Sequence, residues 1–168
     1  MLKRKKRKLN KKLLKINKKI IVIAHNIRSA FNVGSIFRTS DAAGVSQIIL
    51  SGYCPHPPHP HLLKVSLGAE KVIPYEKCNQ TWRKIIDLKK LGYQIIALEK
   101  TKQAKNIFNF KPKFPLVLIL GNEKKGLSSK ILKYCDEVVF IPMRGYKESL
   151  NVSVAYGIAI YQLINYKS

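Results

Sequence analysis

The chain has 168 residues, enough for one domain with its own hydrophobic core, and a hydrophobic fraction of 46% indicates that most of it folds. It carries 32 Lys and Arg residues against 9 Asp and Glu residues, for a formal net charge of +23. No stretch reaches the roughly eighteen apolar residues of a membrane span. The basic N-terminus is not followed by the apolar segment of a secretory signal. We therefore expect neither a membrane-spanning nor a secreted protein.

The positive charge points to a polyanionic partner. Eleven of the basic residues lie in the first twenty positions, and the other 21 still outnumber the 9 acidic residues. Nucleic acid is the first candidate, because each neutralised phosphate releases counterions. An anionic membrane surface is the second candidate, and a charge that serves solubility alone is the third. Residues 1–19 are expected to form a flexible or marginally helical basic tail before a folded domain at 20–168. The tail cations assigned to RNA binding are Lys3, Arg4, Lys5, Lys6, Arg7 and Lys8.

Continuous apolar strands alternate with helices along the folded part, which predicts an α/β domain with a mostly parallel sheet. Asn32 is expected to cap the first helix and Gly44 to end it. The last helix is apolar on nearly every side, which predicts that it is buried. The expected elements are a strand at 20–24, a helix at 32–44, a strand at 47–52, a Pro-rich extended loop at 53–61, a helix at 81–92, strands at 93–99 and 116–121, a short helix at 128–134, a strand at 137–143 and a helix at 150–164.

Three loops follow expected strands and carry unusual residues. In open α/β sheets, ligands bind beyond the carboxyl ends of the strands, so these loops are the places to search. The first holds Asn26, Arg28, Asn32, Gly34 and Arg38. Arginine grips a phosphate through two parallel hydrogen bonds, and glycine permits a close backbone approach. A capped helix with surface arginines is the alternative interpretation.

The second loop, "LILGNEKKGLSS", looks at first like a phosphate-binding loop. Gly121 and Gly126 have the spacing of that motif, but Leu127 stands where its lysine must be. Without the lysine a nucleoside triphosphate loses its main charge contact. The chain also has no G-x-G-x-x-G motif, so a dinucleotide site is equally poor. Glu123 is the acidic side chain of this loop.

The third loop, "IPMRGYKESLN", leads into the last helix. Ser149 and Asn151 stand at the start of that helix, and either is a preferred N-cap. Capping explains one polar residue there but less easily two. Their place after a strand is also a ligand-binding position. We expect these residues to cap the helix and to line a site.

Together the three segments resemble the SPOUT superfamily, and within it the SpoU/TrmH-type RNA ribose 2′-O-methyltransferases. The residues that carry the resemblance are Asn26, Arg28, Asn32-Val-Gly34 and Arg38, then "LGNEKKGLS", then "IPMRGYKESLNVSVA". They span about residues 20 to 165. The intervening "LLKVSLGAEKVIPY" also resembles many members of the family.

The resemblance implies an α/β sheet with helices on both faces and a C-terminal trefoil knot, a rare exception to the rule against knots. It implies S-adenosylmethionine as the cofactor and a homodimer whose subunits share the active site. The RNA target is expected to be a transfer RNA first and a ribosomal RNA second. The positions that match the cofactor site are Leu98, Gly121, Asn122, Ile141, Met143 and Leu150.

The resemblance also assigns roles in the reaction. Arg38 is expected to clamp a substrate phosphate and to help activate the ribose hydroxyl, and Arg28 to bind RNA. Asn32 would orient Arg38 or the ribose, and Glu123 would hold the loop and the catalytic residues in place. Ser149 and Asn151 would complete the pocket. A non-catalytic RNA-binding or ribosome-associated protein on the same scaffold is the alternative function, and a base methyltransferase is a third.

The cysteine and histidine residues raise the questions of a disulfide and of a metal site. Cys54, Cys78 and Cys135 are odd in number and widely spaced, which predicts free thiols in a reducing cytoplasm. The stretch "CPHPPHPH" could be read as a metal site. Its prolines would hold the ligands extended, so we expect no metal and a rigid loop that bears on RNA or on a partner subunit. Phe37 and Trp82 are expected in the core.

Overall fold

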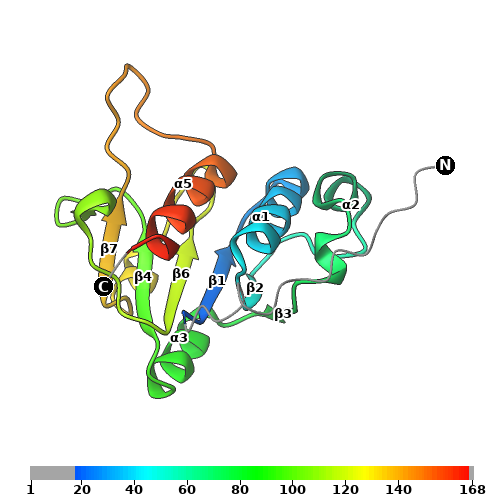
Figure 1. Ribbon diagram of the computed structural model, residues 1–168, viewed down its shortest axis with the longest axis horizontal. Helices are drawn as coiled ribbons and strands as arrows, with labels where there is room; N and C mark the ends of the chain where they lie inside the picture. Colours follow the sequence, from blue (N-terminus) through cyan, green and yellow to red (C-terminus); the bar gives the residue numbers. More distant parts are fainter. Residues whose placement is uncertain (1–17, 167–168) are drawn as a thin grey trace.

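The computed structural model describes residues 18–166 (Figure 1). Seven strands form one sheet, and every pair of neighbouring strands is parallel. The tail cations expected to bind RNA lie outside the described residues. The strands, in their order across the sheet, are β3 (Tyr75–Cys78), β2 (Gln47–Ser51), β1 (Ile20–His25), β6 (Leu116–Leu120), β4 (Gln94–Leu98), β7 (Glu137–Phe140) and β5 (Lys105–Asn106).

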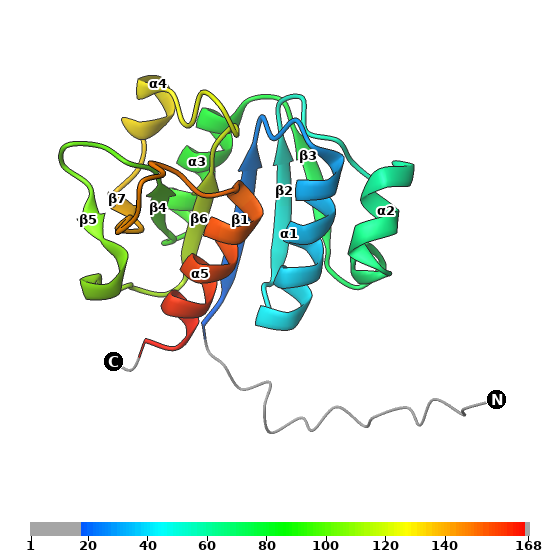
Figure 2. The same cartoon turned by 90° about the horizontal axis from the view of Figure 1, so that it is seen from above.

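Helices cover both faces of this sheet (Figure 2). The central strands are apolar at successive positions, as expected for strands buried on both sides. The helices are α1 (Ala30–Ala43), α2 (Pro60–Ser66), α3 (Thr81–Lys90), α4 (Ser129–Leu132) and α5 (Val152–Ile164), with single 3₁₀ turns at Ala69–Lys71 and Ile107–Asn109. Val22 belongs to a core with α1, α2 and α5, and its neighbour Ile23 belongs to a second core with α3 and α4. The predicted α/β class, parallel sheet and two-sided helical cover are confirmed.

Two strands and one helix were not expected from the sequence. Strands β3 and β5 lie at the two edges of the sheet, where only one neighbour supports them. Helix α2 begins inside the Pro-rich stretch that was predicted to be extended throughout. Pro60 stands at its first position, where the missing N–H costs nothing and the fixed φ favours a helix.

The helix starts also differ from the prediction. Ser29, not Asn32, caps α1, because the Ser29 hydroxyl accepts from the Asn32 N–H at 3.3 Å. Asn32 lies one turn inside the helix, which frees its side-chain amide for other contacts. Gly44 ends α1 in the left-handed region, as predicted. Helix α5 begins at Val152 and is capped by Asn151, so Ser149 precedes the helix without capping it.

The expectation that α5 is wholly buried is wrong for this chain. One side packs against α1 and the sheet, where Tyr156 and Ile160 are fully buried. The opposite side is open: Val154 is 51% exposed and Tyr161 is 44% exposed. An apolar helix that is half exposed leaves a surface that a partner can cover.

The carboxyl ends of the strands meet at one edge of the sheet, which we call the carboxyl edge. Strand β1 lies between β2 and β6, so the chain order reverses between β1 and β6, and such a switch point is the usual ligand crevice of α/β sheets. The described chain begins at the opposite edge, where the strands start, which we call the amino edge. There the Lys18 Nζ donates to the carbonyls of Ile164 and Tyr166 at 3.0 and 2.5 Å. Within residues 18–166 no helix is long and apolar enough to cross a membrane.

Candidate active site

Glu123, in the loop after β6, ties that loop to the loop after β1. Its Oε1 accepts from the Ser29 N–H and from the Asn32 side-chain amide, each at 3.0 Å. Its Oε2 accepts from the Arg28 N–H at 3.0 Å. The N–H groups of Arg28 and Ser29 stand just before the first helical residue and have no partner within the helix, so a carboxylate there satisfies them and suits the positive end of α1. Glu123 therefore fixes the start of α1 against β6.

The same contacts set the ionisation of Glu123. Burial works to raise the pKa of its carboxyl group, but the hydrogen bonds from Arg28, Ser29 and Asn32 outweigh burial and lower the pKa below its ordinary value of 4.5. A carboxylate that is stabilised as an anion and committed to several donors is a poor proton acceptor. These contacts suit Glu123 to holding the loops together, which is the role that the family resemblance predicted for it.

Asn32 extends this network to the third loop. The Asn151 side-chain amide donates to the Asn32 Oδ1 at 3.1 Å, while the Asn151 Oδ1 accepts from the Ser153 N–H at 2.9 Å. A side-chain amide has two N–H groups and one carbonyl oxygen. The Asn32 side chain thus donates one N–H to Glu123, accepts from Asn151 at its oxygen, and keeps one N–H free. The chain Asn151–Asn32–Glu123 joins three segments that are far apart in the sequence.

Asn122 adds a second set of links. Its side-chain amide donates to the Asn26 carbonyl at 2.8 Å and to the Tyr53 hydroxyl at 2.9 Å. Its Oδ1 accepts from the N–H groups of Lys124 and Lys125 at 3.0 and 2.9 Å. The loops after β1, β2 and β6 are therefore held at fixed positions relative to one another.

The loop after β6 folds back on itself, and this requires glycine. Asn122 and Gly126 form an antiparallel bridge, and a Cβ on Gly121 would lie 2.6 Å from the Gly126 carbonyl carbon. No larger residue fits at Gly121 without moving backbone. Glu99, after β4, also supports the returning chain, because its carboxylate accepts from the Leu127 N–H at 2.7 Å.

Two adjoining cavities lie among these loops, of about 290 and 150 Å³. Together they fall in the lower part of the range of small-molecule sites, roughly 300–1,000 Å³. Both are lined by Leu98, Glu99, Ser149, Leu150 and Ala155. Their walls hold all six positions expected to bind the cofactor: Leu98, Gly121, Asn122 and Leu150 in the larger cavity, and Ile141 and Met143 in the smaller one.

The chemistry of these walls fits S-adenosylmethionine, which combines an apolar ring face with a positively charged sulfonium. Leu98, Ile141 and Leu150 offer apolar surface, while the carboxylates of Glu99 and Glu148 offer negative charge. Such a mixture of apolar walls and a few polar groups is typical of cofactor sites. The residues present therefore fit the cofactor expected from the sequence.

The predicted catalytic residues do not all meet. Asn32, Glu123 and Asn151 are joined by hydrogen bonds, and Glu123, Asn151 and the exposed Ser149 line the larger cavity. Arg38 stands apart. It lies six residues after Asn32 on α1, about 9 Å further along the helix axis. Its side chain is exposed, lines neither cavity, and makes no ion pair or hydrogen bond with residues 18–166.

Arg28 joins the hydrogen-bond network of the site through its main-chain N–H. Its N–H is held by Glu123, while the residue itself is exposed and its guanidinium makes no polar contact with a described residue. The side chain is thus available to a partner, as an RNA-binding residue requires.

Three site residues were missed in the sequence. Glu99 and Tyr53 each follow a strand, so the strand-end rule could have found them. His25, the last residue of β1, could not have been found, because its partners Ser51 and Thr81 come from separate elements. Its Nδ1 lies 2.9 Å from the Thr81 hydroxyl, its Nε2 lies 3.1 Å from the Asn26 amide, and burial lowers its pKa below 6.5.

The Cys54 and histidine stretch does not gather around one point. Cys54 is buried, and its thiol donates to the Ala24 carbonyl at 3.0 Å. Burial raises the pKa of that thiol to about 11, which opposes the thiolate that a metal needs. In the part of the chain that the structure describes, no three His, Cys, Asp or Glu side chains are placed to hold a metal ion. All three cysteines are free thiols, as predicted.

Comparison with known proteins identifies the family. The model of the SpoU rRNA Methylase family matches residues 19–161. This chain belongs to that family. A tRNA (guanosine(18)-2′-O)-methyltransferase from Aquifex aeolicus is 34% identical over 96% of the chain and 76% of its own length. A 23S rRNA (guanosine-2′-O-)-methyltransferase RlmB from Pseudomonas putida is 30% identical over 86% of the chain. The chain spans only 58% of that second protein.

Solved structures agree with this assignment to the SpoU family. A crystal structure of the A. aeolicus TrmH/SpoU tRNA modifying enzyme superposes with a TM-score of 0.78 at 34% identity, over 86% of this chain and 73% of that one. An AdoMet-bound rRNA methyltransferase from Sinorhizobium meliloti superposes with a TM-score of 0.78 at 27% identity, over 87% of this chain and 55% of that one. The predicted resemblance to SpoU-type methyltransferases is confirmed.

Proposed function

We propose that this chain is an S-adenosylmethionine-dependent RNA methyltransferase that acts on a ribose 2′-hydroxyl, in tRNA as the first choice and rRNA as the second. The observation that carries the proposal is the chain Asn151–Asn32–Glu123, which joins three loops beside the paired cavities. A protein that only bound RNA would have no need to fix these loops around a small-molecule cavity. The names of the relatives and the AdoMet-bound neighbour support the same reaction.

In this reaction the protein itself forms no covalent bond to the substrate. S-adenosylmethionine, when bound, supplies the methyl group from its sulfonium. The chain must hold the ribose so that its 2′-oxygen lies in line with that methyl group, and positioning of this kind contributes several kcal/mol to rate enhancement. Ser149, Asn151 and the free N–H of Asn32 are the polar groups beside the cavity that can orient the ribose. Asn32 and Glu123 act by positioning the loops.

The 2′-hydroxyl is a weak acid, so the site must also favour its ionised form. Arg38 is assigned to this task. Its guanidinium stays protonated, so it clamps a substrate phosphate and stabilises negative charge at the hydroxyl oxygen and does not remove the proton itself. This assignment requires Arg38 to reach a cavity from which it is separated in the single chain.

A homodimer with shared active sites meets that requirement. The exposed apolar side of α5, with Val154, Ile158 and Tyr161, supports an interface between two copies. Helix α1, which carries Arg38, packs directly against α5. We place the Arg38 of one protomer in the site of its partner.

Subunit complementation tests this arrangement. Arg38→Ala and Asn151→Ala chains, each carrying a different affinity tag, are produced together so that mixed dimers form. If Arg38 serves the partner's site, the mixed dimer regains one intact site while both parent dimers stay inactive. A mixed dimer as inactive as its parents would place Arg38 in its own protomer's site.

The C-terminal trefoil knot belongs to the same proposal. Strand β7 lies beyond β4, but α5 packs against α1 and β6, so residues 141–151 must return across the end of β4 (Figure 2). Threading of this return through the loop before β6 would form the knot and would place Leu150 beside Leu98. We also assign the reducing cytoplasm as the compartment, in keeping with the three free thiols.

The test is methyl transfer from labelled S-adenosylmethionine to unmodified small RNA and ribosomal RNA, followed by nucleoside analysis. Label in a 2′-O-methylnucleoside supports the proposal, and the labelled RNA fraction identifies the target class. Label in a methylated base indicates a base methyltransferase. No transfer, together with no binding of S-adenosylmethionine in calorimetry, favours the non-catalytic RNA-binding protein.

The basic tail has its own test. Of the predicted tail at 1–19, residues 1–17 precede the described part of the chain and hold nine Lys and Arg residues and no acidic residue. Deleting them is expected to weaken RNA binding and to reduce the slope of log Kd against log salt, because fewer counterions are released. Unchanged affinity at low salt would remove the tail from RNA binding.

A further inference from the structure

Three aromatic rings form a row on the surface at the starts of α1 and α2. The Phe31 and His61 ring centroids lie 5.0 Å apart, with 32° between the ring planes. The His61 and His59 centroids lie 5.6 Å apart. We call Phe31, His61 and His59 the aromatic ridge. Phe31 is 47% exposed and His61 is also exposed, so the row presents ring surface to solvent.

The packing of α2 on α1 holds the ridge in place. The Leu62 carbonyl lies so close to α1 that a Cβ on Gly34 would be 2.6 Å from its oxygen. Gly34 was expected to permit a close backbone approach, and α2 makes that approach. Because His61 directly precedes Leu62, this contact fixes the His61 ring beside Phe31. The Leu62 side chain is fully buried and belongs to the core on the α1 side of the sheet.

The ridge lies beside the candidate active site. Phe31 directly precedes Asn32, which bonds to Glu123. Tyr53, 58% exposed, stands between the two regions, since its hydroxyl accepts from the Asn122 amide in the site while its ring remains open to solvent. An extended strand of RNA that places one ribose at the cavity would continue across this surface.

The charge around the ridge favours an anionic partner. Asp41 is the only acidic residue among residues 1–69, and it lies in the last turn of α1, at the opposite end from Phe31. Glu123 also lies at the start of α1, but its carboxylate is bound to the N–H groups of Arg28 and Ser29. On the cationic side, the Lys77 Nζ lies 3.3 Å from the His56 Nε2 in the loop that leads to the ridge. Exposed aromatic rings in basic surroundings are the usual surface for single-stranded nucleic acid, because bases stack on the rings while cations meet the phosphates.

We propose that the aromatic ridge stacks an unpaired base of the substrate RNA that neighbours the methylated nucleotide. This proposal rests on the proposed function for the identity of the substrate. The ridge would extend the RNA contact beyond the ribose and would favour unpaired or looped targets, whose bases are free to stack. A second candidate, a contact of the ridge with another protein chain, is an outcome of the test below.

The experiment uses the full chain and a twelve-residue oligoriboadenylate that carries one 2-aminopurine, whose fluorescence falls when the base stacks. Phe31→Leu and His61→Leu remove a ring but keep apolar bulk, whereas Phe31→Tyr and His61→Phe keep a ring. Phe108→Leu is the matched control, because Phe108 is 50% exposed but belongs to the 3₁₀ turn after β5, at the far edge of the sheet.

Each ring-removing variant is expected to bind about 5- to 100-fold more weakly, with less quenching. The salt dependence of Kd should stay unchanged, because the phosphate contacts remain. Phe31→Tyr, His61→Phe and Phe108→Leu should behave as the wild type. Equal affinity and quenching in all variants would overturn the proposal. So would a loss of dimer in light scattering by Phe31→Leu, which would assign the ridge to a protein contact.

The binding experiment contains no S-adenosylmethionine and no transfer step. A chain that binds the oligonucleotide through the ridge but transfers no methyl group would therefore contradict the proposed function and support the ridge. Methyl transfer with no effect of the ring-removing variants on binding or on kcat/KM would do the reverse.

Discussion

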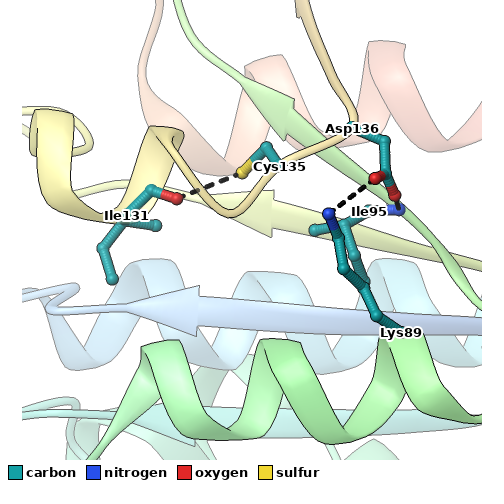
Figure 3. A network of polar contacts seen from close by, with 5 residues as sticks. All are labelled: Lys89, Ile95, Ile131, Cys135 and Asp136. Carbon is teal, nitrogen blue, oxygen red and sulfur yellow. Dashed lines mark hydrogen bonds and ion pairs between the residues drawn. The ribbon is translucent and has the colours of Figure 1, made fainter.

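One carboxylate at the carboxyl edge of the sheet and one at the amino edge accept hydrogen bonds from backbone N–H groups, but the two differ in what their partners are. At the amino edge, the Asp136 carboxylate accepts from the Ile95 N–H at 2.8 Å and pairs with the Lys89 Nζ at 2.6 Å (Figure 3). These partners join β4 and α3 to the turn before β7. The contact ends at a half-exposed lysine.

At the carboxyl edge, Glu123 also accepts hydrogen bonds from backbone N–H groups, but it belongs to a longer hydrogen-bond network. Through Asn32 they reach Asn151, and the segments joined in this way line the larger cavity. A carboxylate that binds main-chain donors is thus no sign of a functional site by itself. What distinguishes Glu123 is that its partners are loops around a cavity, whereas those of Asp136 are packed elements. The following variants test this difference.

Arg38→Ala is expected to have the largest effect. Its methyl transfer should fall by at least about 100-fold, the scale of losing one stabilising group in a transition state. Its melting temperature should stay unchanged, because the exposed side chain has no polar partner within residues 18–166. Arg38→Lys should recover only part of the activity, since an ammonium lacks the paired N–H groups of a guanidinium. If RNA affinity fell in parallel with activity, the role in activation would be wrong.

Glu123→Gln should lower both activity and stability. The amide keeps one acceptor oxygen in place of two, so at least one N–H at the start of α1 loses its partner. We expect about 1–3 kcal/mol less stability in urea unfolding, and a fall in kcat of roughly 10-fold or more as the loops lose their register. Unfolding and single-turnover methyl transfer measure the two effects. Normal activity in this variant would show that the loop network does not position the site.

The pH dependence of stability offers a sharper measure of the same group. Because the pKa of Glu123 is lower in the folded state than its ordinary 4.5, the carboxylate stabilises the fold above pH 4.5. This contribution is lost as the pH falls below 4.5 through the lowered folded pKa. In Glu123→Gln the loss over that window should be smaller than in the wild type. Identical pH profiles would mean that the hydrogen bonds to Glu123 contribute no differential stability.

Asp136→Asn is the matched change at the amino edge. Its amide still offers an oxygen to Ile95 but cannot pair with Lys89, so stability should fall by about 1 kcal/mol or less, as for a partly exposed ion pair. Methyl transfer should be unchanged. A loss of activity comparable to that of Glu123→Gln would remove the distinction between the two edges.

These two edges also show what a sequence can predict. Apolar runs and strand-end loops located the sheet, the major helices and the three segments that meet at the carboxyl edge. The start of α1 was misplaced by three residues, since Ser29 and Asn32 are both good caps and only the position of Glu123, 91 residues beyond Asn32, leaves Asn32 free. Helix α2 was missed because proline is common in both extended segments and first helical turns. The open side of α5 could not be inferred, because an apolar pattern does not tell the core of one chain from a surface that a partner covers.

The smallest expected effect is that of replacing His25, the last residue of β1, whose contacts connect the end of that strand to the site. The Asn26 amide donates to the His25 Nε2, so Nε2 carries no proton and Nδ1–H is left to donate toward the Ser51 and Thr81 hydroxyls. A doubly protonated ring would set an N–H against the Asn26 amide. Burial lowers the pKa of His25 below 6.5, in the same direction.

The unfolded chain therefore takes up this proton at a higher pH than the folded chain. Stability should fall as the pH drops below 6.5, down to the lowered folded pKa, and His25→Gln should remove that part of the slope. Urea unfolding of both proteins between pH 5 and 8 measures it, and the other three histidines, common to both, cancel in the difference. The main-chain carbonyl of Asn26 accepts a hydrogen bond from the Asn122 side chain. Protonation of His25 should therefore also weaken the contact between the loop after β1 and the loop after β6. If kcat falls together with stability at low pH in the wild type but not in His25→Gln, protonation of His25 acts on the loops of the site. If kcat depends on pH in the same way in both proteins, His25 only packs at the end of β1.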